Sequence, residues 1–231
     1  MNIEKVIAID GPSGSGKSTM AKKLAKQLNI VFIDTGSMFR TLSIVLDRLS
    51  LKNSSDDEIE SALKKINIEY MPNPKTLISV DGEDFTLAIR EHHVSELASI
   101  YSQKIPVRNF LLQFQRELAQ SRVCVMEGRD IGTVVFPNSF CKVFVTASSQ
   151  VRAQRRLEQL AEKNPNENYN LAKIKEDVEA RDKMDMEREV APLKQAEDAI
   201  LLDTSDMNEE EVLTFLIKTS HEKAKAAGIP L

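Results

Sequence analysis

The sequence predicts an α/β protein in which helices flank a five-stranded parallel sheet. Short apolar runs, each suited to one buried strand, alternate with segments whose apolar residues recur at helical spacing. Strand–helix–strand units with short connections of this kind make neighbouring strands parallel, with a right-handed crossover. The expected strands are residues 6–9, 31–34, 123–126, 142–146 and 199–203.

Residues 66–87 break this pattern and predict a small antiparallel sheet. Apolar and polar residues alternate there, prolines interrupt the run, and Asp81-Gly82 is a favoured hairpin turn. An insertion at the carboxyl end of a strand is a candidate substrate-holding lobe, and a surface hairpin without a binding role is the alternative. Helices are expected at about 38–49, 54–65, 91–121, 171–188 and 208–226.

Composition limits the classes of protein to consider. The 231 residues are 42% hydrophobic and 29% charged, which is ordinary for a soluble globular chain. A net charge of −4 argues against a general nucleic-acid binder, and no apolar run approaches the ~20 residues that span a bilayer. Cys124 and Cys141 lie in strand-like runs without metal-ligand spacing, so buried free thiols are expected. The first strand follows the N-terminus directly, without a signal peptide, and we expect a cytoplasmic protein.

Residues 11–18 match the phosphate-loop pattern G-x-x-x-x-G-K-[ST]. The loop follows the first strand, and a helical pattern follows the loop, so Lys17 is expected near a helix N-terminus. Inward-facing N–H groups and the helix dipole hold phosphate oxygens in such loops. Lys17 can reach the β- and γ-phosphates of ATP, and the Ser18 hydroxyl is a natural direct ligand of Mg²⁺. The expected ATP-binding residues of the loop are Gly11, Pro12, Ser13, Gly14, Ser15, Gly16, Lys17, Ser18 and Thr19.

Charged residues also follow the second and third strands at their carboxyl ends, where open α/β sheets bind ligands. Asp34 and Arg40 follow the second strand, and Glu127, Arg129 and Asp130 follow the third. Acids beside a phosphate loop suggest that Asp34 and Glu127 hold Mg²⁺ through water. Taken alone, Arg40 could equally be a solvated helix residue.

A later helix carries Arg152, Arg155 and Arg156 ahead of the polar stretch 163–170. Arginines placed before a flexible connection predict a mobile helical lid over residues 150–170 that closes on phosphates. An exposed basic helix face is the alternative interpretation.

The helix expected at 171–188 places Arg181, Asp185 and Arg188 on one face, because they are four and three residues apart. Spacing alone favours intrahelical ion pairs on the surface, which contribute little stability.

Together these motifs resemble the bacterial-type cytidylate (CMP/dCMP) kinase family of nucleoside monophosphate kinases, over nearly the whole chain. The resemblance implies a P-loop NTPase fold with sheet order 2-3-1-4-5. It also implies a core at residues 1–36, 108–149 and 171–231, a monophosphate-binding domain at 37–107 and a lid at 150–170. The motifs are IDGPSGSGKST at 9–19, DTGSMFR at 34–40, GRDIGTVVFP at 128–137, RDKMDMEREVAPL at 181–193 and DAILLDTS at 198–205.

The resemblance also implies roles that spacing left open. Arg40, Arg129 and Arg188 match residues that bind the phosphate of the monophosphate, with Arg181 close by, and Asp185 matches a residue at the sugar hydroxyls. Residues that read cytosine are matched by Ser99, Arg108 and Asp130. The implied catalytic residues are Lys17, Arg129, Arg181 and Arg188, and Arg155 and Arg156 join the ATP site. The implied CMP site is Thr35, Phe39, Arg40, Ser99, Arg108, Arg129, Asp130, Arg181, Asp185 and Arg188.

The implied reaction is Mg²⁺-dependent transfer of a phosphoryl group from ATP to CMP or dCMP by a monomeric enzyme. Phe39 stands where tyrosine is common in the family, which puts a substrate-side hydroxyl contact in doubt, and Met184 stands where a charged or polar residue is frequent. A kinase for UMP, AMP or shikimate on the same scaffold is the nearest alternative. A regulatory GTPase would need an N-K-x-D motif, and this sequence contains none.

Overall fold

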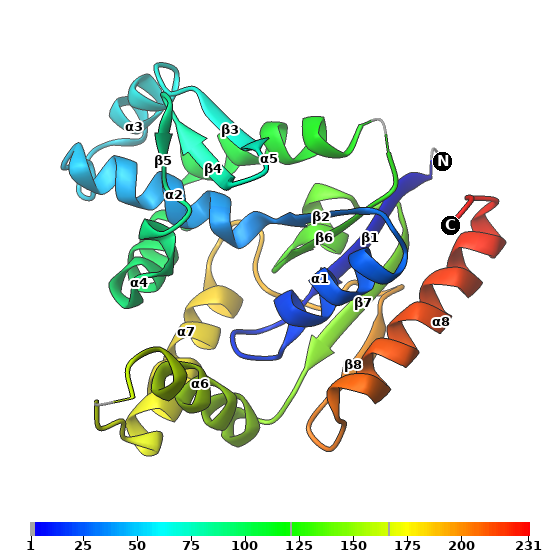
Figure 1. Cartoon of the computed structure of the whole chain (residues 1–231). Coiled ribbons are helices and arrows are strands. Elements are labelled where there is room, and N and C mark those ends of the chain that lie inside the picture. The colour runs from blue at the N-terminus through cyan, green and yellow to red at the C-terminus, as the bar shows by residue number, and fades with distance from the viewer. Residues whose placement is uncertain (1–2, 121, 166) are drawn as a thin grey trace. The chain divides into compact units, whose positions relative to one another are not determined.

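Figure 1 shows the computed structural model, which describes residues 3–120, 122–165 and 167–231, without the side chains of Pro72, His92 and Lys163. The main sheet has five strands in the order β2-β6-β1-β7-β8. In sequence order this is 2-3-1-4-5, so the predicted α/β fold and sheet order are confirmed. The strands are β1 (Glu4–Asp10), β2 (Val31–Asp34), β6 (Cys124–Gly128), β7 (Ser139–Thr146) and β8 (Ile200–Asp203).

The chain divides into two compact units, and the first, residues 1–33 and 119–231, contains this sheet apart from Asp34. β1 is central and pairs in parallel with β6 and β7, so that Ile7 lies opposite Val125 and Cys141. Residues 6–10 are all buried, because a central strand is covered on both faces. The continuous apolar run in the sequence therefore specified its place in the sheet.

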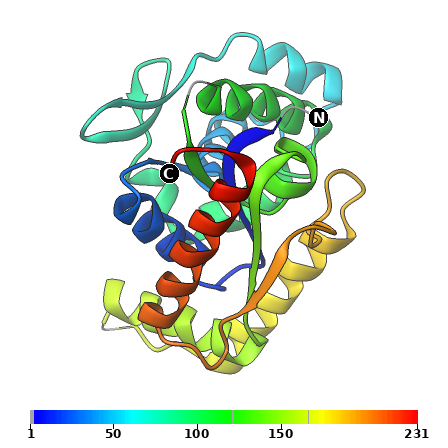
Figure 2. The same cartoon turned by 90° about the vertical axis from the view of Figure 1, so that its right-hand side faces the viewer.

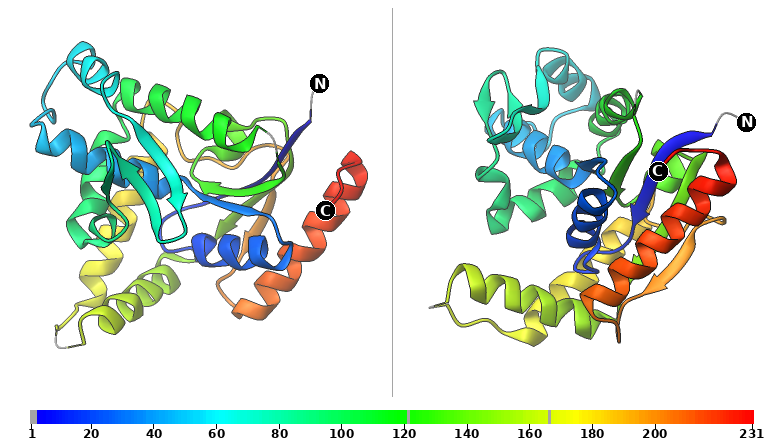
Figure 3. Two further views of the ribbon diagram at one scale, coloured as in Figure 1. Left: turned by 45° about the horizontal axis from the view of Figure 1, so that its top comes forward. Right: turned by 45° about the vertical axis from the view of Figure 1, so that its right-hand side comes forward.

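The described residues of unit 1 also form the helices α1 (Lys17–Gln27), α6 (Ser149–Lys163), α7 (Leu171–Glu187) and α8 (Glu209–Ala227) and the short π-helical turn η2 (Ile131–Val135). α1 and α8 contact each other and share the main core with the sheet through Leu24 and Leu216. α8 runs along β7 (Figure 2). α6 and α7 lie side by side (Figure 3) and have a small core of their own, formed by Ala153, Leu160, Ile174 and Val178.

Unit 2, residues 34–118, contains the helices α2 (Thr35–Arg48), α3 (Asp56–Leu63), α4 (His92–Tyr101) and α5 (Ile105–Ala119, whose last residue falls in unit 1), with the short 3₁₀ turn η1 (Ala88–Arg90). Its sheet is antiparallel, with β3 (Ile68–Asn73), β4 (Thr76–Val80) and β5 (Glu83–Asp84). Asp81 and Gly82, both with positive φ, form the turn between β4 and β5. The antiparallel insertion expected at 66–87 is therefore confirmed.

Several element boundaries differ from the sequence expectations, for local reasons. α2 begins at Thr35 rather than residue 38, because the Asp34 carboxylate accepts the Ser37 N–H and caps the helix three residues earlier. The helix expected over 91–121 is two helices, with Pro106 in the first turn of α5, where a missing N–H costs little. The GRDIG segment was not expected to be helical, yet residues 131–135 form the π-helical turn.

Candidate active site

The phosphate loop connects the end of β1 to the start of α1, which begins at Lys17. Gly11 has φ 153° and Gly14 has φ 75°, values that side chains rarely adopt. A Cβ at Gly11 would lie 2.0 Å from the backbone oxygen of Val145, so only glycine fits. The loop therefore makes a tight glycine turn that ends at the N-terminus of α1, and such a turn is the kind of structure that binds phosphate.

Lys17 and Ser18 meet the carboxylate of Glu127 at the end of β6. The Ser18 hydroxyl donates to Glu127 Oε1 at 2.8 Å, and Lys17 Nζ lies 3.9 Å from Glu127 Oε2. Lys17 Nζ also donates to the backbone oxygen of Pro12 at 3.1 Å. Burial, reinforced by the charge of Arg129, lowers the pKa of Lys17 from 10.5 to about 7, although Glu127 opposes that shift. An arriving phosphate would supply the negative charge that restores the lysine cation.

The donor set at Ser18 and Glu127 suits Mg²⁺. A hydroxyl and a carboxylate oxygen are hard ligands, and they lie together at the mouth of the phosphate loop. Among the residues that the structure describes, no group of three or more His, Cys, Asp or Glu side chains could hold a metal ion. Mg²⁺ bound by few protein ligands, with phosphate and water completing its shell, fits such a site.

Asp34, the other acid predicted to hold Mg²⁺ through water, is the first residue of unit 2, and its carboxylate contacts groups close by in the sequence. It caps α2 and forms an ion pair with Arg40 at 3.1 Å, both within unit 2.

Asp185 links two arginines: Arg129, which follows β6, and Arg188, which follows α7. Arg129 Nε donates to Asp185 Oδ2 at 2.9 Å, and Arg188 NH1 lies 3.4 Å from Asp185 Oδ1. Burial alone would raise the pKa of Asp185, but Arg129, Arg181 and Arg188 hold it below its usual range. The predicted acceptor-phosphate residues of unit 1 therefore gather in one ionic cluster, in which Asp185 and Arg188 are buried and Arg129 and Arg181 are half-buried.

Asp130 belongs to the same cluster, 3.8 Å from Arg188 NH2. The turn that follows it is fixed by Asp10, whose carboxylate accepts the N–H groups of Ile131 at 2.9 Å and Gly132 at 2.8 Å. Burial raises the pKa of Asp10 to about 7, although these two hydrogen bonds oppose the shift. Asp10 is not among the site residues predicted from the sequence, where it is only the last residue before the glycine loop.

The lid arginines differ from one another in their contacts. Arg155 donates to the Thr204 hydroxyl at 3.0 Å and backbone oxygen at 2.8 Å, and to the Ser15 backbone oxygen at 3.3 Å. It therefore joins α6, the phosphate loop and the β8–α8 loop. Arg156 is half-buried on the same helix. Arg152 is buried, and it donates to the backbone oxygens of Ala147 and Ser13 and to the carboxylate of Asp182.

Unit 2 carries the remaining predicted residues. Arg108 is buried, donates to the Ser102 backbone oxygen at 3.1 Å, and lies 5.4 Å from the centroid of the Phe39 ring. Ser99 is also buried, and its hydroxyl donates to the Ser95 backbone oxygen. Thr35 is buried in the first turn of α2. The aromatic ring at position 39 thus has a partner that needs no phenolic hydroxyl.

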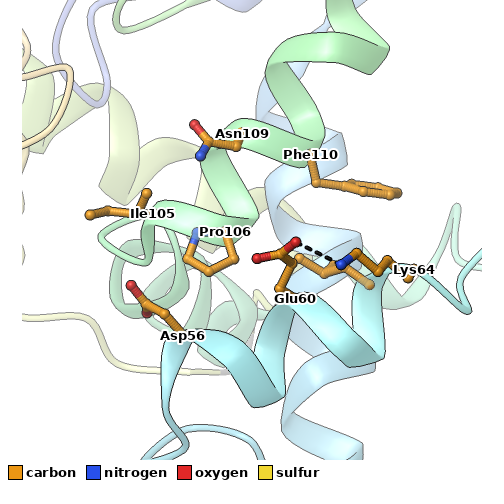
Figure 4. A pocket seen from close by; sticks show the side chains of 8 residues that line it. Asp56, Glu60, Lys64, Ile105, Pro106, Asn109 and Phe110 are labelled. Carbon is orange, nitrogen blue, oxygen red and sulfur yellow. Dashed lines mark ion pairs between the residues drawn. The ribbon is translucent and has the colours of Figure 1, made fainter.

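A hollow of about 390 Å³ lies between α3 and α5 (Figure 4), within unit 2. Its wall includes the Glu60–Lys64 ion pair and the apolar side chains of Ile105 and Phe110. None of its lining residues is a predicted site residue, and the chemistry described above lies elsewhere. A search of the described residues for a helix long and apolar enough to cross a membrane found none.

A buried strand, a glycine loop and a helix that starts at a buried lysine, beside an arginine–aspartate cluster, define a P-loop nucleotide-binding enzyme. Comparison with known proteins gives the family. Residues 7–222 match the family described as "Cytidylate kinase". A cytidylate kinase of Thermosipho melanesiensis is 43% identical over 219 residues, covering 95% of this chain and 98% of the relative. One of Thermotoga maritima is 41% identical over 222 residues, covering 94% and 97%.

A solved structure, TT1252 from Thermus thermophilus, is similar at 16% identity with a TM-score of 0.48, covering 98% of both chains. The chain belongs to the cytidylate kinase family, whose reaction is the phosphorylation of CMP and dCMP. The family resemblance stated from the sequence motifs is confirmed.

Proposed function

We propose that the enzyme transfers the γ-phosphoryl group of ATP to CMP and dCMP through the residues assembled in unit 1. One observation carries this proposal: Glu127, which contacts Ser18 and Lys17 of the phosphate loop, lies two residues before Arg129, which binds Asp185, so the arginine cluster adjoins the loop. A phosphate loop beside a second phosphate-binding cluster suits a reaction between two anions.

The phosphate loop holds the donor. Its N–H groups bind the β- and γ-phosphates, and Lys17 exchanges its contacts with Pro12 and Glu127 for phosphate oxygens. Ser18 and Glu127 would hold Mg²⁺, Ser18 directly and Glu127 through water. When bound, Mg²⁺ neutralises charge on the triphosphate and orients it. Asp34, which pairs with Arg40, is a weaker candidate for a water-mediated contact.

The arginines hold the acceptor. Arg129 and Arg188, with Arg181 beside them and Arg40 from unit 2, bind the phosphate of CMP, while Asp185 contacts the sugar hydroxyls. The acceptor phosphate is already ionised, so the reaction needs no strong general base. Its rate comes from holding the two phosphates in line and neutralising the negative charge between them. Arginine suits this role because its guanidinium stays charged and binds phosphate oxygens in a fork.

Cytosine is read by an acceptor and donors together. The base presents an amino donor beside the N3 and O2 acceptors, and we assign Asp130 to the amino group and Arg108 and Ser99 to the acceptors. Arg108 supports this assignment, because the Ser102 carbonyl and the Phe39 ring hold its guanidinium in one orientation. Uracil, with an oxygen in place of the amino group, would face the Asp130 carboxylate unfavourably.

The donor side is completed by Arg155 and Arg156, and residues 150–170 act as a lid that excludes water from the γ-phosphoryl group. Residue 166 of that range lies outside the described residues. We further propose that the enzyme is monomeric and cytosolic, with nucleotides as its partners.

The test is an acceptor panel in a coupled ADP assay with CMP, dCMP, UMP, AMP and shikimate, alongside Lys17→Ala. We expect the highest kcat/KM with CMP and dCMP. Lys17→Ala should abolish transfer in a folded protein, because Lys17 neutralises charge on the phosphoryl group in transit. Preference for UMP, AMP or shikimate would assign another acceptor to the site. Near-normal turnover by Lys17→Ala would refute the role given to the phosphate loop.

A further inference from the structure

The tip of the phosphate loop is held by two charged side chains that do not belong to the loop. The Ser13 N–H donates to Asp182 Oδ1 at 3.2 Å, and the Ser13 backbone oxygen accepts from Arg152 NH1 at 2.9 Å. Both backbone groups of one loop residue are thus satisfied by partners on α6 and α7, far away in the sequence.

The two side chains also bind each other. Arg152 NH1 donates to Asp182 Oδ2 at 2.5 Å, and their side chains are only 8% and 7% exposed. Arg152 Nε donates to the Ala147 backbone oxygen at 2.9 Å, which fixes the guanidinium to the start of α6. A buried ion pair of this kind needs further hydrogen bonds to offset its desolvation, and Ser13 and Ala147 supply them.

The loop backbone also lies directly on α6. A Cβ added at Gly14 would lie 3.1 Å from both the Cβ and the backbone oxygen of Arg152. The two helices that carry the pair share an apolar cluster that includes Ala153 and Val178, each next to or one turn from a member of the pair. Loop, α6 and α7 therefore meet at Arg152 and Asp182.

We propose that Arg152 and Asp182 are positioning residues for ATP, which hold the phosphate loop in its phosphate-binding conformation without touching the substrate. The inference rests on the proposed ATP role of the loop. A loop with three left-handed or otherwise glycine-only positions has many alternative conformations when released. The apparent affinity for ATP falls in proportion to the fraction of molecules in the competent conformation.

This role differs from the phosphate contacts expected of a lid arginine. Arg152 donates hydrogen bonds to Ser13, Ala147 and Asp182. Arg155, on the same helix, donates to Thr204 and Ser15. The two arginines are therefore predicted to respond differently to mutation. On this proposal Arg155 contacts ATP directly, and Arg152 affects ATP binding through the phosphate loop.

The test compares Asp182→Asn and Arg152→Lys with the wild type, measuring KM for ATP and CMP separately. Asp182→Asn keeps the shape but loses the charge. Arg152→Lys keeps the charge but loses the fork in which Nε binds Ala147 while NH1 binds Ser13 and Asp182. We expect KM for ATP to rise about tenfold in each, with KM for CMP within about twofold of the wild type. Combining the two substitutions should cost no more than the larger single effect, because the pair acts as one unit.

Two further measurements separate positioning from general stability. Hydrogen exchange at residues 13–16 should be faster in both variants, while the core strands β1 and β6 keep their protection. Arg48→Ala is the matched control, because Arg48 forms an exposed ion pair with Glu83 in unit 2, and it should leave both KM values unchanged.

Equal changes in KM for ATP and CMP, or unchanged KM for ATP, would overturn the inference. So would failure of both variants to fold, since the pair would then be a folding element instead. Failure of the proposed function is distinguishable, because it would appear in the wild type as absence of ATP-dependent transfer to CMP.

Discussion

Replacing Asp185 by asparagine tests whether this carboxylate acts mainly by orienting the arginines. Asp185 accepts from Arg129 at 2.9 Å and lies 3.4 Å from Arg188, in a buried position. A hydrogen bond to a charged group contributes roughly 1.5–3 kcal/mol, and the longer contact, with Arg188, is expected to contribute near the lower value. Because an amide retains one acceptor oxygen, we expect a loss of roughly 2–4 kcal/mol in transition-state stabilisation. This corresponds to a fall of about 30- to 900-fold in kcat/KM.

The assay is kcat/KM for CMP and for dCMP, in the wild type and in Asp185→Asn. If this orienting role outweighs the proposed contact of Asp185 with the sugar hydroxyls, both acceptors should lose activity by the same factor within about threefold, because both carry the same phosphate. Asp177→Asn is the control: Asp177 is an exposed carboxylate on the same helix, paired with Lys173, and its loss should change kcat/KM less than twofold. A loss confined to CMP, with dCMP unaffected, would show that Asp185 reads the 2′-hydroxyl and would refute the arginine-orienting role.

Three further outcomes are expected. Asp130→Asn should lower kcat/KM for CMP at least about tenfold more than for UMP, because the amide can donate to uracil O4; equal losses would assign Asp130 to phosphate geometry. Burial raises the pKa of Asp10 from 3.8 to about 7, so the folded protein retains a proton that the unfolded chain loses. The unfolding free energy of the wild type relative to Asp10→Asn should therefore fall between about pH 4 and 7, by up to about 1.4 kcal/mol per pH unit, then level off. Urea titrations across that range measure this, and parallel profiles would contradict it. Residues 150–170 should exchange amide hydrogens more slowly when a bisubstrate analogue is bound, and equal protection in both states would contradict lid closure.

Features that depend on local sequence were predictable. The strands, the antiparallel insertion and the phosphate loop follow from apolar runs, turn residues and glycine spacing, whereas the order of the strands was implied by the family resemblance. Ser55 and Glu58 form the capping box at α3 that their three-residue spacing indicates. In each case the residues that determine the structure lie within a few positions of one another.

The ionic arrangement of the site was not predictable in the same way. Asp10 accepts hydrogen bonds from the N–H groups of residues 131 and 132, and Asp182 accepts one from Ser13. Each of these bonds joins positions more than a hundred residues apart. A helix pattern cannot tell whether Arg152 faces solvent or a loop backbone. Spacing alone favoured surface ion pairs for Asp185, and only the folded chain shows it buried between Arg129 and Arg188.

Carboxylates accompany the cations at both proposed phosphate sites of unit 1. Glu127 lies beside Lys17 and Ser18, and Asp185 lies between Arg129 and Arg188. Without these anions the buried cations would repel one another, and the lowered pKa of Lys17 shows how strongly burial already disfavours its charge. A guanidinium has five donors, so an arginine can keep its bond to Asp185 and still bind a phosphate with the rest. On the proposed assignment, the substrate phosphates meet side chains that are already oriented, which is the condition under which electrostatic stabilisation costs no reorganisation during the reaction.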